Sequence, residues 1–144
     1  RSQSLSEIDR TRLLQLLHFM ESEIREFPEH QNLDLATYHQ NKVARRNIER
    51  WAETLVMALI DTAKIIMSSE RQEIPETYYV CVRNCALFLK FSEPDAEQLA
   101  GYVRLRNILS HYYLDQRFNR IKDFITAAEP LYRRFQAAAN AIMR

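Results

Sequence analysis

Residues 48–66 read IERWAETLVMALIDTAKII and form an unbroken helical pattern near the middle of the chain. Large apolar side chains recur there at three- and four-residue steps, the period of a helix with one face against a core. The pattern extends from about Ala36 to Ser68 without a glycine or a proline. Because this is long for a globular helix, we expect it to bend or to begin later than Ala36. The apolar stripe consists of Ile48, Trp51, Leu55, Leu59 and Ile66.

Two further helical patterns flank this long one. The first begins at Ser4 and Glu7, which have the spacing of a capping box, and Pro28 is expected to end it. The other follows Pro75, runs from Thr77 to Phe91, and places apolar side chains on one face. Both patterns therefore predict amphipathic helices.

The C-terminal part of the chain is helical in pattern as well. Ser92 begins an N-cap pattern with a proline in the first turn, and this helix is expected to run toward His111. Asp115 can cap a fifth helix, in which Pro130 should produce a kink or a split. The sequence thus predicts an all-α bundle of four or five helices, with residues 1–144 as a single domain.

The composition agrees with a helical protein. The 144 residues are 47% hydrophobic and 27% charged, which is typical of a globular domain. The single glycine is Gly101, whereas the turns of β-proteins and the phosphate-binding loops of nucleotide-binding proteins need several. One glycine therefore argues against a β-sandwich or a β-barrel and excludes a Walker loop and a dinucleotide-binding loop.

Charge and cysteine content narrow the class of function. The net charge of +1 argues against binding a polyanion over the whole surface and leaves a local patch open. The longest strongly apolar run, Leu55 to Ile60, is too short to span a membrane, and the first residues lack the apolar stretch of a secretory signal. We therefore expect a cytoplasmic protein. Cys81 and Cys85 fit buried, inert thiols better than a disulfide or a metal pair.

Polar side chains crowd residues 104–113, which read RLRNILSHYY. At about 100° per residue, Asn107 and His111 share one face of a helix, and Arg106 and Tyr113 share another. Arg106 and His111 diverge by about 140° on such a helix. They can act on one ligand if the helix ends near His111, if the arginine reaches across, or if a second subunit contributes. The last route predicts a dimer with the site at its interface.

These residue types suit the metal-independent cleavage of RNA by its own 2′-hydroxyl. The reaction needs a base or acid that titrates near neutrality, for which histidine is suited, and a cation on the phosphoryl oxygens, for which arginine is suited. Asn107 can orient the imidazole or donate to the phosphate, and a nearby tyrosine can stack on a base. The alternative is a solvent-facing arginine beside a histidine that ends a helix.

Residues Arg106 to Tyr113 resemble the Arg-x4-His-x-Tyr signature of the HEPN superfamily, in the form carried by HepT-type toxins. Residues 44–50 and 59–64 resemble the second helix of that family. The resemblance spans about Leu13 to Phe135 and implies an all-α HEPN-like bundle. Ser92 to Asp95 and the tail beyond Phe135 depart from the family pattern.

The resemblance implies a specific function. HepT-type proteins are metal-independent ribonuclease toxins of bacterial toxin–antitoxin pairs, and they work as homodimers on RNA without a cofactor. Arg106 and His111 correspond to their catalytic residues. Tyr113 corresponds to the tyrosine to which a minimal nucleotidyltransferase antitoxin attaches AMP, which silences the toxin. We expect this function; the alternatives are a non-catalytic HEPN module that binds a nucleotidyltransferase and a plain helical adaptor.

Three acidic residues lie within the long helical pattern. Asp61 interrupts the apolar part of the long helix, so it either faces water at an edge or pairs with Arg104 or Arg106 and supports the site. Glu49 and Glu53 lie one turn apart and are expected to form a solvated ion-pair face. The partners expected for them are Arg45, Arg46 and Arg50.

Basic and aromatic residues are interleaved around the motif, as in a local RNA-binding patch, although ordinary helix surfaces have the same composition. Three histidines elsewhere lack the spacing of metal ligands and are expected to pack or to lie at the surface. The patch consists of Arg104, Arg106, Arg117, Arg120 and Lys122 with Tyr112, Tyr113 and Phe118; the histidines are His18, His30 and His39.

Overall fold

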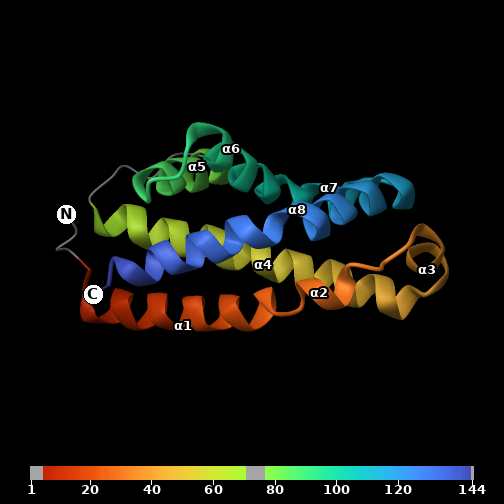
Figure 1. Ribbon diagram of the computed structural model, residues 1–144, viewed down its shortest axis with the longest axis horizontal. Helices are drawn as coiled ribbons and strands as arrows, with labels where there is room; N and C mark the ends of the chain where they lie inside the picture. Colours follow the sequence, from red (N-terminus) through yellow and green to blue (C-terminus); the bar gives the residue numbers. More distant parts are fainter. Residues whose placement is uncertain (1–4, 71–76, 144) are drawn as a thin grey trace.

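The structure is a computed structural model that describes residues 5–70 and 77–143, and the regular elements within these ranges are all helical. Three long helices lie side by side along the long axis (Figure 1), and shorter helices pack over two of them. The expectation of an all-α bundle is confirmed. The long helices are α1 (Glu7–Ile24), α4 (Lys42–Ser69) and α8 (Leu114–Ala141). The shorter elements are α2 (Phe27–His30), α3 (Leu35–Gln40), α5 (Tyr78–Phe88), α6 (Glu93–Gly101), the 3₁₀ turn η1 (Tyr102–Arg104) and α7 (Leu105–His111).

The long helices each bury one face in a common core, and an aromatic cluster occupies its middle. Phe27 packs edge-on against Trp51, with ring centroids 4.8 Å apart, and Phe124 packs edge-on against Tyr132 at 5.8 Å. The buried hydroxyl of Tyr132 donates to the carbonyl of Leu55 at 3.1 Å, so this polar group is satisfied. This hydrogen bond joins α8 to α4, the two helices against which α7 packs.

The first helix begins two residues later than predicted. Ser6 caps α1 by accepting a hydrogen bond from the backbone N–H of Asp9 at 3.0 Å. The predicted cap, Ser4, lies outside the described residues. Pro28 does not end α1, which stops at Ile24; it stands in the first turn of α2, where a missing N–H costs nothing.

The long central pattern is interrupted near its beginning. Asn41 has extended backbone angles and separates α3 from α4, so the long helix starts later than Ala36, as one of the two alternatives held. The side chain of Asn41 accepts a hydrogen bond from the N–H of Ala44 at 3.0 Å. An Asn cap is therefore the physical reason for the break.

The last helix is continuous through its proline. Pro130 lies inside α8 without splitting it. Both Pro130 and Thr126, whose carbonyl loses its helical donor, are exposed, so water can replace the missing hydrogen bond. The expected Asp115 cap is wrong: Tyr113 is the N-cap residue of α8 and makes no side-chain cap, while Asp115 pairs with His39 of α3.

The predicted fourth helix is divided into α6, η1 and α7. Its start is as expected, since Ser92 accepts from the N–H of Asp95 at 3.3 Å with proline in the first turn. The 3₁₀ turn after Gly101 shifts the register of the residues that follow it, because such a turn has 3.0 rather than 3.6 residues. The directions of side chains in α7 therefore cannot be extrapolated from α6.

The structure also bears on the predictions for the two cysteines and for a membrane span. Cys81 and Cys85 are free, buried thiols, which confirms the prediction for them. Among the helices described for residues 5–70 and 77–143, none is both long and apolar enough to cross a membrane.

Candidate functional site

Helix α7 carries the sequence motif, and two buried leucines fix its orientation. Leu105 and Leu109 pack into the core, while the polar residues of the helix face outward. The helix ends at His111, because Tyr112 has extended backbone angles of φ −100° and ψ 159°. One condition for bringing the motif arginine near the histidine, a helix end at that histidine, is therefore met. The exposed polar residues of α7 are Arg106, Asn107, Ser110 and His111.

The side chain of Arg106 lines a hollow of about 370 Å³ between α1, α4 and α7. Asp61 of α4 and the partly exposed ring of Phe19 of α1 line the same hollow. In the part of the chain that the structure describes, no ion pair joins Asp61 to Arg106 or to Arg104. The Arg104 guanidinium instead lies over the ring of Tyr79, 4.4 Å from its centroid. Asp61 thus shares the hollow with Arg106 without pairing with it.

His111 is not among the residues that line this hollow. Neither a hydrogen bond nor an ion pair is formed by its side chain within residues 5–70 and 77–143, so Asn107 does not orient the imidazole here. Asn107 lines a second hollow, formed with α6 and α8. In one protomer, therefore, Arg106 and His111 do not line the same hollow.

Tyr112 and Tyr113 lie beyond the end of α7, so their directions do not follow its helical periodicity. The expected shared face of Arg106 and Tyr113 is wrong, because Tyr113 has extended backbone angles of φ −70° and ψ 162°. Tyr113 is 86% exposed, whereas Tyr112 is 44% exposed and lines the second hollow. Of the two tyrosines, Tyr113 is therefore the more exposed.

The basic residues around the motif divide into two groups. Arg117 binds Glu49, and Lys122 donates to the carbonyl oxygens of residues 31 and 33 at 2.7 and 2.8 Å. These cations hold the fold together, and Phe118 packs on Tyr38. The side chains of Arg106 and Arg120, in contrast, make no ion pair with any described residue. The predicted RNA-binding patch is therefore smaller than the sequence indicated.

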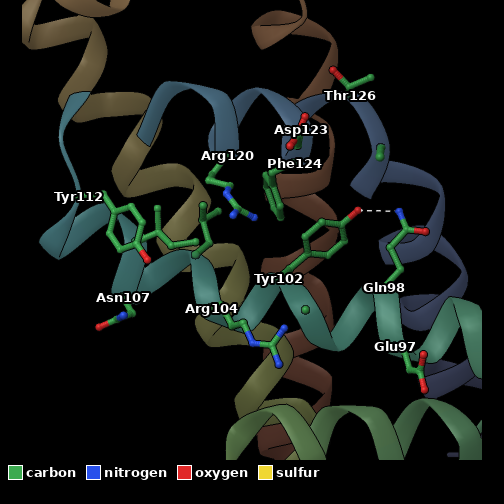
Figure 2. A pocket seen from close by; sticks show the side chains of 14 residues that line it. Glu97, Gln98, Tyr102, Arg104, Asn107, Tyr112, Arg120, Asp123, Phe124 and Thr126 are labelled. Atoms are coloured by element: carbon green, nitrogen blue, oxygen red, sulfur yellow. Dashed lines mark hydrogen bonds between the residues drawn. The ribbon is translucent and has the colours of Figure 1, made fainter. Parts of the chain in front are cut away.

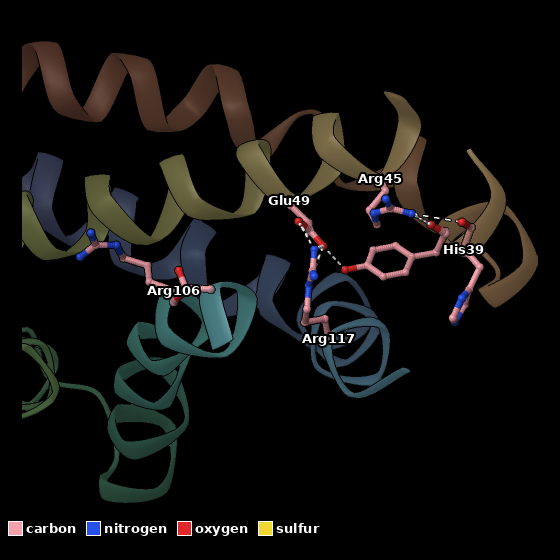
Figure 3. A network of polar contacts seen from close by, with 7 residues as sticks. His39, Arg45, Glu49, Arg106 and Arg117 are labelled. Carbon is pink, nitrogen blue, oxygen red and sulfur yellow. Dashed lines mark hydrogen bonds and ion pairs between the residues drawn. The ribbon is translucent and has the colours of Figure 1, made fainter. Parts of the chain in front are cut away.

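A polar network joins α3, α4 and the start of α8 (Figure 3). The Arg117 guanidinium donates to both carboxylate oxygens of Glu49, with Nη2 2.8 Å from Oε1 and 2.6 Å from Oε2. The hydroxyl of Tyr38 donates to the same carboxylate, and burial together with that carboxylate raises the pKa of Tyr38. Arg45 donates to the carbonyls of Tyr38 and His39. The expected solvated face is thus wrong for Glu49, whose partner comes from another helix.

The remaining histidines lie outside the motif site. His18 is exposed on α1, and His39 is exposed and pairs with Asp115. His30 is partly buried rather than at the surface, with its ring centroid 4.4 Å from that of Trp51. Within the described ranges, no group of three or more His, Cys, Asp or Glu side chains is arranged to hold a metal ion.

Sequence patterns alone do not indicate the second hollow. Tyr102 and Phe124 line it with Asn107, although the three come from η1, α8 and α7. Helical periodicity assigns Phe124 to the core but does not show which residues of other helices lie beside its ring. The one sequence signal is Gly101, a glycine inside a helical pattern.

The sequence model of the family described as Ribonuclease HepT-like matches residues 20–139. The matched span contains α4 and α7 and therefore includes Arg106, His111 and Tyr113. No curated protein and no solved structure matches the chain.

Proposed function

The chain belongs to the HepT-like ribonuclease family, and from this membership we propose that it is a metal-independent endoribonuclease, the toxin of a toxin–antitoxin pair that acts on cytoplasmic RNA. The observation that carries the proposal is the state of the motif on α7. Arg106 and His111 are both exposed, and neither side chain has a hydrogen bond or ion pair among the described residues. A cation and an imidazole left unpaired at the surface are available to a phosphodiester.

The proposed reaction uses no group beyond the RNA and these side chains. His111 accepts the proton of a 2′-hydroxyl while the 2′-oxygen forms a bond to the adjacent phosphorus. The bond from phosphorus to the 5′-oxygen breaks, and that oxygen takes a proton from water or from a second His111. Arg106 donates to the non-bridging oxygens, where negative charge increases in the transition state. The products are a 2′,3′-cyclic phosphate and a 5′-hydroxyl.

We place this site between two copies of the chain. The hollow that holds Arg106 is bordered by Phe19, 41% exposed, and by the partly buried Leu16 and Met57. Apolar side chains around a catalytic arginine favour burial against a second protomer over exposure to water. A two-fold dimer through this face would carry Arg106 of one protomer toward His111 of the other.

Control by a partner is the second part of the proposal. A small nucleotidyltransferase would transfer AMP from ATP to Tyr113: the phenolic oxygen bonds to the α-phosphorus, and pyrophosphate leaves. The 86% exposure of Tyr113 supports this acceptor. The added phosphate is an anion that unpaired cations beside the motif can bind in place of the substrate phosphodiester.

A non-catalytic module that binds a nucleotidyltransferase is the rival function, and the absence of His111 from the lining of the Arg106 hollow favours it. Incubation of the protein with total RNA in EDTA distinguishes the two, with His111→Ala as the inactive comparison. We expect the wild type to cleave RNA under chelation and to leave 2′,3′-cyclic phosphate or 3′-phosphate ends. Activity that disappears in EDTA and returns with magnesium would contradict the mechanism. No cleavage under either condition would favour the rival.

A further inference from the structure

The second hollow lies between α6, η1, α7 and α8 and has a volume of about 870 Å³ (Figure 2). Its floor is aromatic: the edge of Phe124 meets the ring of Tyr102, with centroids 5.2 Å apart and planes at 89°. Arg120 reaches into it from α8 between Tyr112 and Tyr102, as Figure 2 shows, and the carboxylates of Glu97 and Asp123 also line it. The hollow therefore combines the ring of Tyr102 with an arginine that forms no ion pair within the described ranges and with two carboxylates that can accept hydrogen bonds from the amino groups of a base.

Gly101, the one glycine of the chain, lines this hollow, and neither backbone nor packing requires a glycine there. Its φ of −60° and ψ of −26° are ordinary helical angles that any residue adopts. A Cβ atom built on Gly101 meets nothing within 4 Å, so the fold has room for a side chain. Glycine in a helix is destabilising by about 0.5–1 kcal/mol relative to alanine. The space beside Gly101 is therefore open to a ligand.

The groups around the hollow match the chemistry of a nucleotide. Aromatic and guanidinium planes stack on nucleobases, and an arginine can bind a phosphate. Gln98 donates to the hydroxyl of Tyr102 at 2.9 Å, which leaves the hydroxyl proton and the amide oxygen free for the edge of a base. A flexible loop of RNA offers such a base, because its bases are unstacked.

The position of the hollow relates it to the motif. Asn107 follows Arg106 directly, yet it lines this hollow while Arg106 lines the other. Tyr112, which also lines it, directly follows His111. The hollow is thus on the side of α7 opposite the Arg106 hollow and adjoins both motif residues in sequence.

We propose that this hollow binds one nucleotide of the RNA next to the cleaved phosphodiester, with its base against Tyr102, its sugar over Gly101 and a phosphate on Arg120. The inference rests on the proposed ribonuclease function and extends it to the contact that selects where RNA is cut. Single-stranded RNA is the occupant it requires, since a paired base is already stacked and cannot enter.

The test pairs a change in the hollow with a change in the RNA. In a His111→Ala background, which prevents cleavage, fluorescence anisotropy measures binding of a short labelled RNA that contains a site cleaved by the wild type. Two further RNAs each lack the base on one side of that site. Gly101→Leu projects a leucine side chain into the hollow, and Ala137→Leu places the same side chain at an exposed position of α8. Arg120→Gln removes the cation, with Arg133→Gln, whose surface ion pair is with Glu129, as the matched loss of charge on the same helix.

We expect removal of one flanking base to weaken binding about tenfold in the His111→Ala background and in both controls. Gly101→Leu should weaken binding of the intact RNA by a similar factor and make the missing base irrelevant, because the two changes remove the same contact. Arg120→Gln should weaken binding of every RNA, by more than Arg133→Gln does. Circular dichroism and thermal unfolding verify that each variant is folded.

Two results would overturn the inference, and they can be told apart. If Gly101→Leu and Arg120→Gln bind RNA like their controls while the wild type cleaves RNA, the hollow is not a nucleotide site and the ribonuclease proposal stands. Independent effects of Gly101→Leu and the missing base lead to the same conclusion. If the wild type neither binds nor cleaves RNA, both proposals fail together.

Discussion

Arg117 of α8 binds Glu49 of α4 with both side chains largely withdrawn from water, 21% and 13% exposed, and with Nη2 and Oε2 2.6 Å apart. The two residues are 68 positions apart in sequence. Arg117 donates its backbone N–H to the carbonyl of Tyr113 at 2.9 Å, in the first turn of α8. The ion pair therefore anchors the beginning of α8 to α4, directly after the turn that carries His111 and Tyr113.

Removing one member of this pair should destabilise the fold strongly. Glu49→Ala leaves the Arg117 guanidinium and the Tyr38 hydroxyl without their acceptor, and we expect the free energy of unfolding to fall by about 2–3 kcal/mol. Glu129→Ala is the control, because its partner Arg133 is 51% exposed and such pairs contribute about 0.5 kcal/mol. Urea unfolding followed by circular dichroism measures both. Equal losses in the two variants would show that the Glu49 pair is an ordinary surface contact.

The buried thiols predict a loss of stability in alkali. Burial raises the pKa of Cys85, and of Cys81, above the ordinary thiol value. Above about pH 8.5 the unfolded thiols lose protons that the folded ones keep, so the unfolded state is favoured by up to about 1.4 kcal/mol per pH unit for each thiol. The stability that these thiols contribute is complete below that pH and declines above it.

Cys85→Ala tests this directly. The variant should be less stable at pH 7, because it leaves a small cavity. Its unfolding free energy should decline less steeply than that of the wild type between about pH 9 and 10. Parallel pH profiles for the two proteins would contradict the assignment to Cys85.

A stabilising substitution follows from the end of α5. Lys90 has a φ of 76°, in the left-handed region, and its N–H binds the carbonyl of Leu87 while that of Phe91 binds the carbonyl of Ala86. Glycine adopts this conformation without a Cβ penalty, so Lys90→Gly should raise the unfolding free energy by about 1 kcal/mol. Lys90→Ala keeps the Cβ and should leave stability nearly unchanged. A decrease in Lys90→Gly would show that the lysine side chain stabilises the turn.

The fold was predictable from sequence where a helix buries a continuous stripe. The apolar period around Trp51 and Leu55 depends on residues a few positions apart, and those residues are buried in α4. Breaks were less predictable, because an Asn cap at Asn41 and a 3₁₀ turn after Gly101 are local choices that leave the apolar period nearly intact. The apolar period therefore predicted a single helix where the structure has α3 and α4, and a single helix where it has α6 and α7.

Some features of the candidate site could likewise be predicted from the sequence and others could not. Arg106 and His111 are both exposed, because Arg106 lies between the buried Leu105 and Leu109 and His111 follows them at the end of α7. The direction of Tyr113 could not be derived, because the helix ends two residues earlier. Nor could the partner of Glu49, because a tertiary ion pair between helices has no period in the sequence.

Tyr113 should be the control point of the activity. Tyr113→Phe keeps the ring and removes the acceptor oxygen, so this variant should cleave RNA like the wild type and remain active after incubation with the cognate nucleotidyltransferase, ATP and magnesium. Intact-mass measurement should show one added AMP on the wild type and none on the variant. Tyr112→Phe is the matched control and should still accept AMP. Modification of Tyr112, or silencing of Tyr113→Phe, would refute the assignment.

The proposed active site is made by two protomers, one providing Arg106 and the other His111. Arg106→Ala and His111→Ala proteins, each inactive, can be mixed under conditions that exchange subunits. Half of the resulting dimers are then mixed, and each mixed dimer contains one complete site of two. RNA cleavage in EDTA should return to about a quarter of the wild-type rate. Activity that stays at the level of the separate variants, although native mass spectrometry shows mixed dimers, would contradict the composite site.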